Sequence, residues 1–261
     1  MKLLLALLSI VALTQSGLAQ TRVDVELVLA VDTSRSMDFD ELKIQREGYA
    51  KALEHPAVTS VFSMGPEGRI ALAYFEWGGL GQVNLLVDWT VLESPEDAAE
   101  VARQLRSMPV YGQRGTSISG AIEWGIDMIS QNDFDGTRRV IDISGDGPNN
   151  SGRPVLIARD KAANLGITVN GLPFMIKAPE GPYSIPDLDI FYQDCVITGE
   201  DAFVIPVYEM ERLVISIRQK LVQEISGLTP PRTEKLHKAT YSDCLIGEKM
   251  RRNWEGNFLS P

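Results

Sequence analysis

Residues 23–36 read VDVELVLAVDTSRS, and this stretch decides the fold class. It is continuously apolar over 27–31, which is typical of a strand buried on both faces of a parallel sheet. Asp32 ends the apolar run. Asp38 and Glu41 then form a capping-box pattern, which predicts that a helix follows at once. A buried strand followed directly by a helix indicates an α/β protein.

The alternation of strand and helix patterns continues to residue 225. The glycine-rich link 78–81 is too short for a helical crossover, so the strands on either side form an antiparallel hairpin at one edge. The other strands are separated by helices, which parallel pairing requires. We therefore expect a doubly wound, Rossmann-like, mostly parallel sheet with one antiparallel edge strand and helices on both faces. Later strands are expected at 70–76, 83–89, 139–144, 168–175 and 201–207, and later helices from about residues 94, 117, 155 and 210.

The first residues carry the pattern of an exported protein. Lys2 supplies a positive start, residues 3–13 are apolar, and residues 17–19 suit cleavage. The apolar run is about half of the roughly 20 residues that span a bilayer, which favours a cleaved signal peptide over 1–19 against an uncleaved membrane anchor. We expect a periplasmic or extracellular protein that is not inserted in a membrane after cleavage, because no later stretch is long and apolar enough.

The rest of the chain suits one domain with a tail. Its length fits one sizeable core rather than two, so we expect a domain over 20–228 and a tail over 229–261. The proline-containing segment 177–193 is expected to be a long loop. In an oxidising compartment Cys195 and Cys244 are expected to pair and tether the tail, with two free buried thiols as the alternative.

Charge excludes some partners. The formal net charge is −10, and no stripe of Lys and Arg interrupts the acidity. Nucleic acid and anionic membrane surfaces are therefore not expected to bind.

Oxygen-bearing side chains fall in three expected strand-to-helix loops. Asp32, Ser34 and Ser36 follow the first strand, Thr116 precedes a helix, and Asp146 follows a later strand. In open parallel sheets, ligands collect beyond the carboxyl ends of the strands, which is where these loops meet. Two carboxylates and three hydroxyls, with water completing the shell, suit a hard divalent cation. This favours Mg²⁺, with Mn²⁺ or Ca²⁺ as alternatives.

These three segments resemble the DxSxS, Thr and Asp loops of the metal-ion-dependent adhesion site in von Willebrand factor A (VWA) domains. The similarity covers residues 23–225 and includes the antiparallel edge strand. Within that family the chain is most similar to secreted bacterial proteins of uncharacterised function. It departs from the commonest pattern at Arg35, where a glycine often stands, and at Gly145, where a threonine often stands.

The resemblance implies a set of metal ligands and a partner. The hydroxyls of Ser34, Ser36 and Thr116 would contact the metal. Asp32 and Asp146 would contact it directly or through water. An acidic side chain of a protein partner would supply the final ligand through a strong charge-assisted bond. The function implied is metal-dependent protein binding without catalysis.

Other readings of the same residues stay open. A DxSxS pattern alone is weak evidence, since Asp and Ser also cap helices and stabilise turns, so a structural or assembly component that uses no metal is an alternative. A metal-dependent hydrolase is less well supported. Position 34 is Ser where phosphatases of the haloacid dehalogenase type resemble DxDx[TV], no GxSxG or Walker pattern occurs, and the histidines are only His55 and His237. Asp142 is either an acceptor behind the site or a buried structural group.

Overall fold

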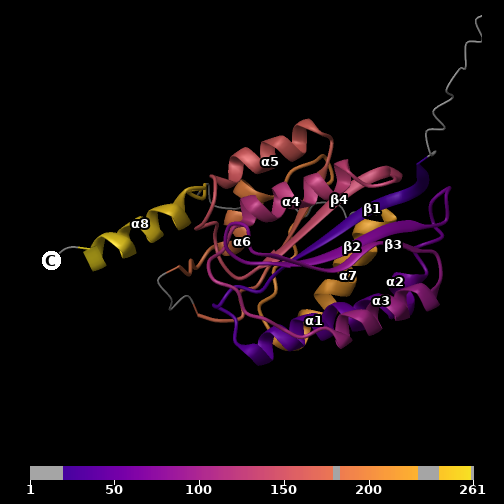
Figure 1. Ribbon diagram of the computed structural model, residues 1–261, viewed down its shortest axis with the longest axis horizontal. Coiled ribbons are helices and arrows are strands. Elements are labelled where there is room, and N and C mark those ends of the chain that lie inside the picture. The colour runs from indigo at the N-terminus through magenta and orange to yellow at the C-terminus, as the bar shows by residue number, and fades with distance from the viewer. Residues whose placement is uncertain (1–19, 179–182, 229–240, 260–261) are drawn as a thin grey trace, which may run out of the picture.

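The computed structural model describes residues 20–178, 183–228 and 241–259 (Figure 1). The expected signal peptide over residues 1–19 lies outside the described residues. So do residues 229–240 of the expected tail. No helix in the described ranges combines the length and the apolar character needed to cross a bilayer.

The described part of the chain contains a five-stranded sheet in the order β3-β2-β1-β4-β5. β1 pairs in parallel with β2 and β4, β4 pairs in parallel with β5, and β3 is the antiparallel edge strand next to β2. The predicted fold class is therefore confirmed. The strands are β1 (Thr21–Asp32), β2 (Ile70–Trp77), β3 (Val83–Leu92), β4 (Phe134–Gly145) and β5 (Thr168–Pro173).

Helices cover both faces of the sheet, as the alternation of side chains along β1 requires. Leu27 and Leu29 pack into the core beneath the first group of helices, whereas Val28 and Ala30 pack into the core beneath the second. Figure 1 shows the two groups on opposite sides of the strands. The first group is α1 (Phe39–Leu53), α2 (Pro56–Thr59), α3 (Pro95–Ser107) and α7 (Leu213–Ser226), and the second is α4 (Ile118–Ser130) and α5 (Val155–Asn164).

Local chemistry sets where α1 begins. The Asp38 carboxylate accepts hydrogen bonds from the Asp40 and Glu41 N–H groups at 3.0 and 2.9 Å. The Glu41 carboxylate accepts from the Asp38 N–H at 2.8 Å, which completes the predicted capping box. This start fixes the length of the turn after β1, which carries Ser34 and Ser36.

The predicted strand at 201–207 is wrong. This segment lies along β5 but pairs with it only at isolated bridges, Val204 with Gly171 and Val207 with Phe174. The Ile205 N–H still donates to the Gly171 carbonyl at 3.0 Å. The segment bonds to β5 through Phe203, Ile205 and Val207, and the ladder is interrupted at Pro173 of β5, which has no N–H to donate to the Ile205 carbonyl.

The expected loop at 177–193 is also more ordered than predicted. Its end contains α6 (Leu188–Phe191), and one turn of π-helix over Tyr192–Val196 follows directly. Phe191 of α6 and Tyr192 and Cys195 of this turn are fully buried, because both elements pack against the core beneath α4 and α5. Apolar packing therefore gives structure to a segment whose prolines indicated a loop.

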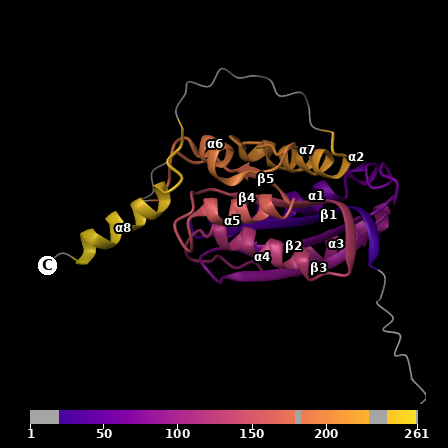
Figure 2. The same ribbon diagram turned by 90° about the horizontal axis from the view of Figure 1, so that it is seen from above.

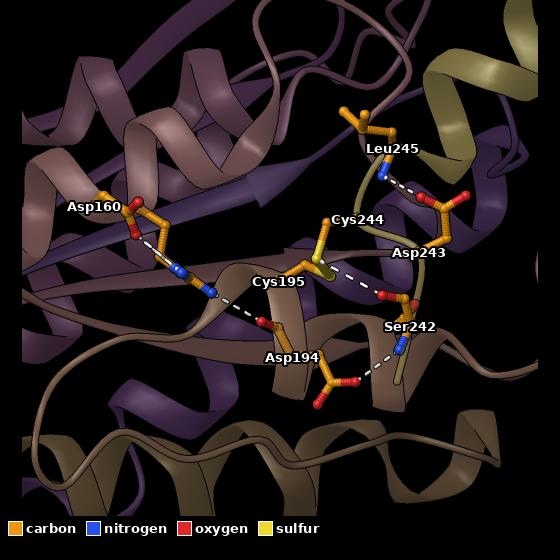
Figure 3. The surroundings of a disulfide bond; sticks show 8 residues. Asp160, Asp194, Cys195, Ser242, Asp243, Cys244 and Leu245 are labelled. Atoms are coloured by element: carbon orange, nitrogen blue, oxygen red, sulfur yellow. Dashed lines mark hydrogen bonds and ion pairs between the residues drawn. A yellow bond between two sulfur atoms is a disulfide. The ribbon is translucent and has the colours of Figure 1, made fainter. Parts of the chain in front are cut away.

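A disulfide joins Cys195 in the π-helical turn to Cys244 in the C-terminal segment, with a Cα–Cα distance of 5.4 Å (Figure 3). Beside it, the Ser242 N–H donates to the Asp194 carboxylate at 2.8 Å. The helix α8 (Ile246–Leu259) follows, and in Figures 1 and 2 it extends away from the sheet and its covering helices. The disulfide thus fixes the start of α8 to the domain.

A buried ionic cluster holds α7 against the sheet. Lys220 lies 2.8 Å from Asp142 of β4 and also contacts Glu224 one turn further along α7. Asn170 of β5 donates to Glu224 at 3.0 Å, and the cluster is almost completely excluded from solvent. Of the two roles left open for Asp142, this contact supports the structural one. Burial is the main cause that raises the pKa of Glu224 to about 7, and the Asp142 carboxylate adds to it.

The free energy of unfolding is expected to fall as the pH rises from the ordinary pKa of Glu224 to its raised value in the folded protein. An unfolded chain releases the Glu224 proton near its ordinary pKa of 4.5, whereas the folded chain keeps it to about 7. The folded state therefore binds more protons between these values and loses about 3 kcal/mol of stability from pH ~4 to pH ~8. Urea unfolding should show that Glu224→Gln removes this part of the pH dependence. The exposed control Glu211→Gln should behave like the unaltered chain, and equal pH profiles for all three would contradict the assignment.

Candidate metal centre

Four of the five predicted site residues lie at the carboxyl ends of the neighbouring strands β1 and β4. Asp32 is the last residue of β1, and Asp146 directly follows β4. The parallel register pairs Val31 with Ser144, so the chain leaves both strands at the same edge of the sheet. The loops that follow the two parallel strands therefore meet at this edge, and their side chains lie close together.

Four of the predicted ligands are linked by direct contacts. The Ser36 hydroxyl donates to Asp146 Oδ1 at 2.6 Å, and the Ser34 hydroxyl lies 3.5 Å from the same oxygen. The two serine oxygens are 2.9 Å apart. The Ser34 N–H donates to Asp32 Oδ1 at 2.7 Å, which is a local turn bond that holds the carboxylate beside the serines.

Thr116 lies in the loop between α3 and α4, so the expectation that a strand precedes its loop is wrong. It joins this group through the backbone of the loop after β4. Its carbonyl accepts from the N–H groups of Asn150 and Ser151 at 2.9 and 3.1 Å, and its N–H donates to the Asn150 side chain at 2.9 Å. A Cβ on Gly147 would lie 3.8 Å from the Thr116 hydroxyl oxygen. The structure thus places Thr116 against the loop that carries Asp146, so all five predicted residues lie at one edge.

The Asp32 carboxylate is completely buried, and only one of its two oxygens accepts a hydrogen bond. Its Oδ2 atom has no hydrogen-bond partner among the described residues. Burial and then repulsion by Asp146 raise the pKa of Asp32 well above its ordinary value. Burial is also the first cause of the raised pKa of Asp146, while the hydrogen bond from Ser36 and the nearby charge of Lys177 oppose the rise. Lys177 thus partly offsets the charge of Asp146, whereas the rise in the pKa of Asp32 is opposed by hydrogen bonds from Ser34 and the Asp146 backbone.

A hard divalent cation fits this arrangement. It would satisfy the orphaned Asp32 oxygen, relieve the repulsion between the carboxylates and accept hydroxyl ligands from the loops. Within the described ranges, no group of three or more His, Cys, Asp or Glu side chains has metal-binding geometry. The candidate site has two carboxylates, so any cation here depends on the hydroxyls and on ligands from outside the chain.

The structure adds a residue that sequence patterns did not indicate. A Cβ on Gly145 would lie 2.8 Å from Asp32 Oδ2 and 2.9 Å from the Tyr192 hydroxyl, so only glycine fits there. Tyr192 therefore lies where a threonine side chain at position 145 would point. Burial, and then the charge of Asp32, raise the pKa of Tyr192 well above its usual range, which keeps its hydroxyl protonated. No local pattern marks Tyr192, because it comes from the distant π-helical turn.

The C-terminal segment also supports the site. The Asn149 side chain donates to Glu248 of α8 at 2.7 Å, and its own oxygen accepts from the Ser119 N–H of α4 at 3.0 Å. Gly247 lies so close to Asn149 that a Cβ there would come within 2.1 Å of the Asn149 carbonyl oxygen. The start of α8 therefore packs against the loop after β4, which carries Asp146 and forms hydrogen bonds with Thr116.

Similar solved structures share this fold. The chain matches proximal thread matrix protein 1 from the mussel byssus, in a structure with a zinc-occupied MIDAS motif, at a TM-score of 0.58 and 13% identity over 79% of this chain and 49% of that one. It matches a von Willebrand factor type A protein from Catenulispora acidiphila at 0.53 and 14% identity, over 78% and 43%. It matches the vWF domain of the type V pili tip protein Mfa5 from Porphyromonas gingivalis at 0.55 and 11% identity, over 80% and 97%.

The sheet order, the helices on both faces and these similarities define the class: the chain has the von Willebrand factor A fold. It spans about half the length of the mussel protein and less of the Catenulispora protein. No curated protein matches it. The chain belongs to the family described as protein of unknown function (DUF1194), whose sequence profile matches residues 22–229.

Proposed function

We propose that this chain is an exported, non-enzymatic VWA domain that binds a protein partner through a divalent cation. Asp32, Ser34, Ser36, Thr116 and Asp146 would hold the cation, and a carboxylate of the partner would complete its coordination. The buried Asp32 oxygen without a hydrogen bond carries the proposal, because burying an unpaired carboxylate oxygen is costly unless a ligand satisfies it.

The donor atoms favour Mg²⁺. All the proposed ligands are oxygens, which suit Mg²⁺, Mn²⁺ or Ca²⁺ better than a soft metal. The mussel relative has zinc in its MIDAS motif, so zinc belongs in any comparison of metals. With only two carboxylates and several neutral hydroxyls around it, the cation keeps the charge to attract one more anionic ligand.

Binding rather than catalysis also agrees with the position of the described histidine. His55 accepts a hydrogen bond from the Ala57 N–H at the start of α2 and contacts Arg218 of α7 at 2.8 Å. It therefore has a capping role away from the strand-end loops. The signal-peptide pattern and the disulfide support export, and the pilus-tip relative has the same fold.

Recovery of a partner should depend on metal. Immobilised protein lacking residues 1–19 is incubated with an envelope extract in Mg²⁺ or in chelator, and bound proteins are identified by mass spectrometry. We expect a partner that is retained in Mg²⁺, released by chelator and not retained by Asp32→Asn, while the exposed control Asp135→Asn retains it. Equal recovery under all conditions would contradict metal-dependent binding.

A further inference from the structure

An open pocket of about 500 Å³ lies beside the candidate metal centre. It is formed by the β2–β3 hairpin over residues 81–84, by residues 111–114 before α4, and by Arg35 from the turn after β1. Arg35 stands between Ser34 and Ser36 in the chain, and Arg114 stands two residues before Thr116. The pocket is therefore continuous with two of the three loops of the site.

The backbone of the pocket is held in place. The Gln82 side chain accepts from the Arg114 N–H at 3.0 Å and donates to the Arg114 carbonyl at 3.1 Å. The Gln113 N–H donates to the Thr33 carbonyl at 2.7 Å, which ties this loop to the turn of the metal centre. The positions from which Arg35 and Arg114 project are therefore set before any ligand arrives, which lowers the entropic cost of binding.

These two guanidinium groups have no acceptor among the described residues. Of the other described arginines, only Arg252 shares this property, and each of the rest contacts a carboxylate, a carbonyl or a ring nitrogen. No Asp or Glu lines the pocket. The chain has a net charge of −10, so two unpaired guanidinium groups at one pocket form a local region of positive charge. Such a region favours an anionic ligand.

We propose that this pocket binds a second carboxylate of the partner, so that the partner presents a pair of acidic side chains. One would complete the metal, as the proposed function requires, and the other would bind between Arg35 and Arg114. Guanidinium groups bind carboxylates in a bidentate geometry, and such charge-assisted bonds are stronger than neutral ones. The neutral Asn84 amide, which also lines the pocket, can orient the same segment.

Peptides with two glutamates test whether the pocket binds a second carboxylate. Peptides with short glycine spacers of different length between two glutamates are titrated into the protein in Mg²⁺ by calorimetry, beside a peptide with one glutamate. With the best spacer we expect about tenfold tighter binding than with one glutamate. The variant Arg35→Gln/Arg114→Gln should lose this advantage but still bind the one-glutamate peptide. The matched variant Arg252→Gln should keep it.

The outcomes separate this inference from the proposed function. An arginine-dependent preference that persists in chelator and in Asp32→Asn would overturn the metal proposal and leave the pocket assignment intact. If no two-glutamate peptide binds more tightly than the one-glutamate peptide, or if the arginine substitutions do not change the preference, the pocket assignment is wrong. Stronger binding of a matched phosphoserine peptide would also overturn it.

Discussion

Asp32→Asn is expected to stabilise the metal-free protein and, at the same time, to abolish its binding of Mg²⁺. The Asp32 carboxylate is fully buried, has one unpaired oxygen and faces a second carboxylate, Asp146. An amide removes that charge and keeps an oxygen that can accept from the Ser34 N–H. At a pH at which the carboxylate is ionised, we expect a gain of about 1–3 kcal/mol in the free energy of unfolding in chelator, because an uncompensated buried charge is removed.

The same substitution removes a proposed metal ligand. The affinity for Mg²⁺ should fall at least about a hundredfold, since even residues behind a ligand change affinity by 10 to 100 times. Thermal unfolding with and without Mg²⁺ measures both effects. The unaltered protein should be stabilised by Mg²⁺ and the variant should not, while Asp135→Asn on the exposed side of β4 should follow the unaltered protein. A variant that is destabilised in chelator would show that the carboxylate has a structural role instead.

Removal of the disulfide is expected to have the largest effect on stability. Cys195 and Cys244 are 49 residues apart, and closing a loop of this length is worth about 4 kcal/mol in the chain-entropy model. We expect Cys195→Ser/Cys244→Ser to lose a free energy of unfolding of this size in urea titrations under non-reducing conditions. A loss below about 1 kcal/mol would contradict a stabilising role for this bond.

The same variant should loosen the candidate metal centre locally. The disulfide holds α8 where Glu248 and Gly247 contact Asn149, and the next residues, Asn150 and Ser151, donate their N–H groups to Thr116. Hydrogen exchange of these two amides in metal-free protein should therefore become faster. Glu248→Ala, which keeps the disulfide, should speed their exchange with little loss of global stability. Unchanged exchange in both variants would show that the C-terminal segment does not support the loop.

Local chemistry made much of the fold predictable. The apolar run of β1, the capping box of α1 and the glycine-rich hairpin link each act over a few residues, and the structure has all three. Residues 201–207 had a strand-like composition, yet Pro173 of the neighbouring β5 has no N–H for the ladder and limits them to isolated bridges. The pattern of apolar residues was a stronger signal there than the missing N–H group, and it was misleading.

Contacts between distant segments could not be predicted. The loops after β1 and β4 bring four of the predicted ligands to one edge, because that edge follows from the parallel sheet alone. Thr116 reaches it from the loop between α3 and α4, through its bonds to Asn150 and Ser151. Tyr192 reaches Gly145 only through the packing of the π-helical turn, and Lys220 meets Asp142 only through the position of α7. Arg46 forms a buried ion pair with Glu76, 30 residues away, which periodicity along α1 does not reveal. Such pairings depend on tertiary packing rather than on local patterns.

A calorimetric titration of Mg²⁺ into the metal-free protein tests the central claim most directly. We expect saturable binding of one ion. We also expect proton release, visible as a heat that depends on the buffer, at pH values at which the raised pKa values of Asp32 and Asp146 leave these carboxyls partly protonated, because a metal requires both to be ionised. The heat should be absent in Asp32→Asn. No saturable binding of Mg²⁺, Mn²⁺, Ca²⁺ or Zn²⁺, or the same binding in Asp32→Asn, would contradict it.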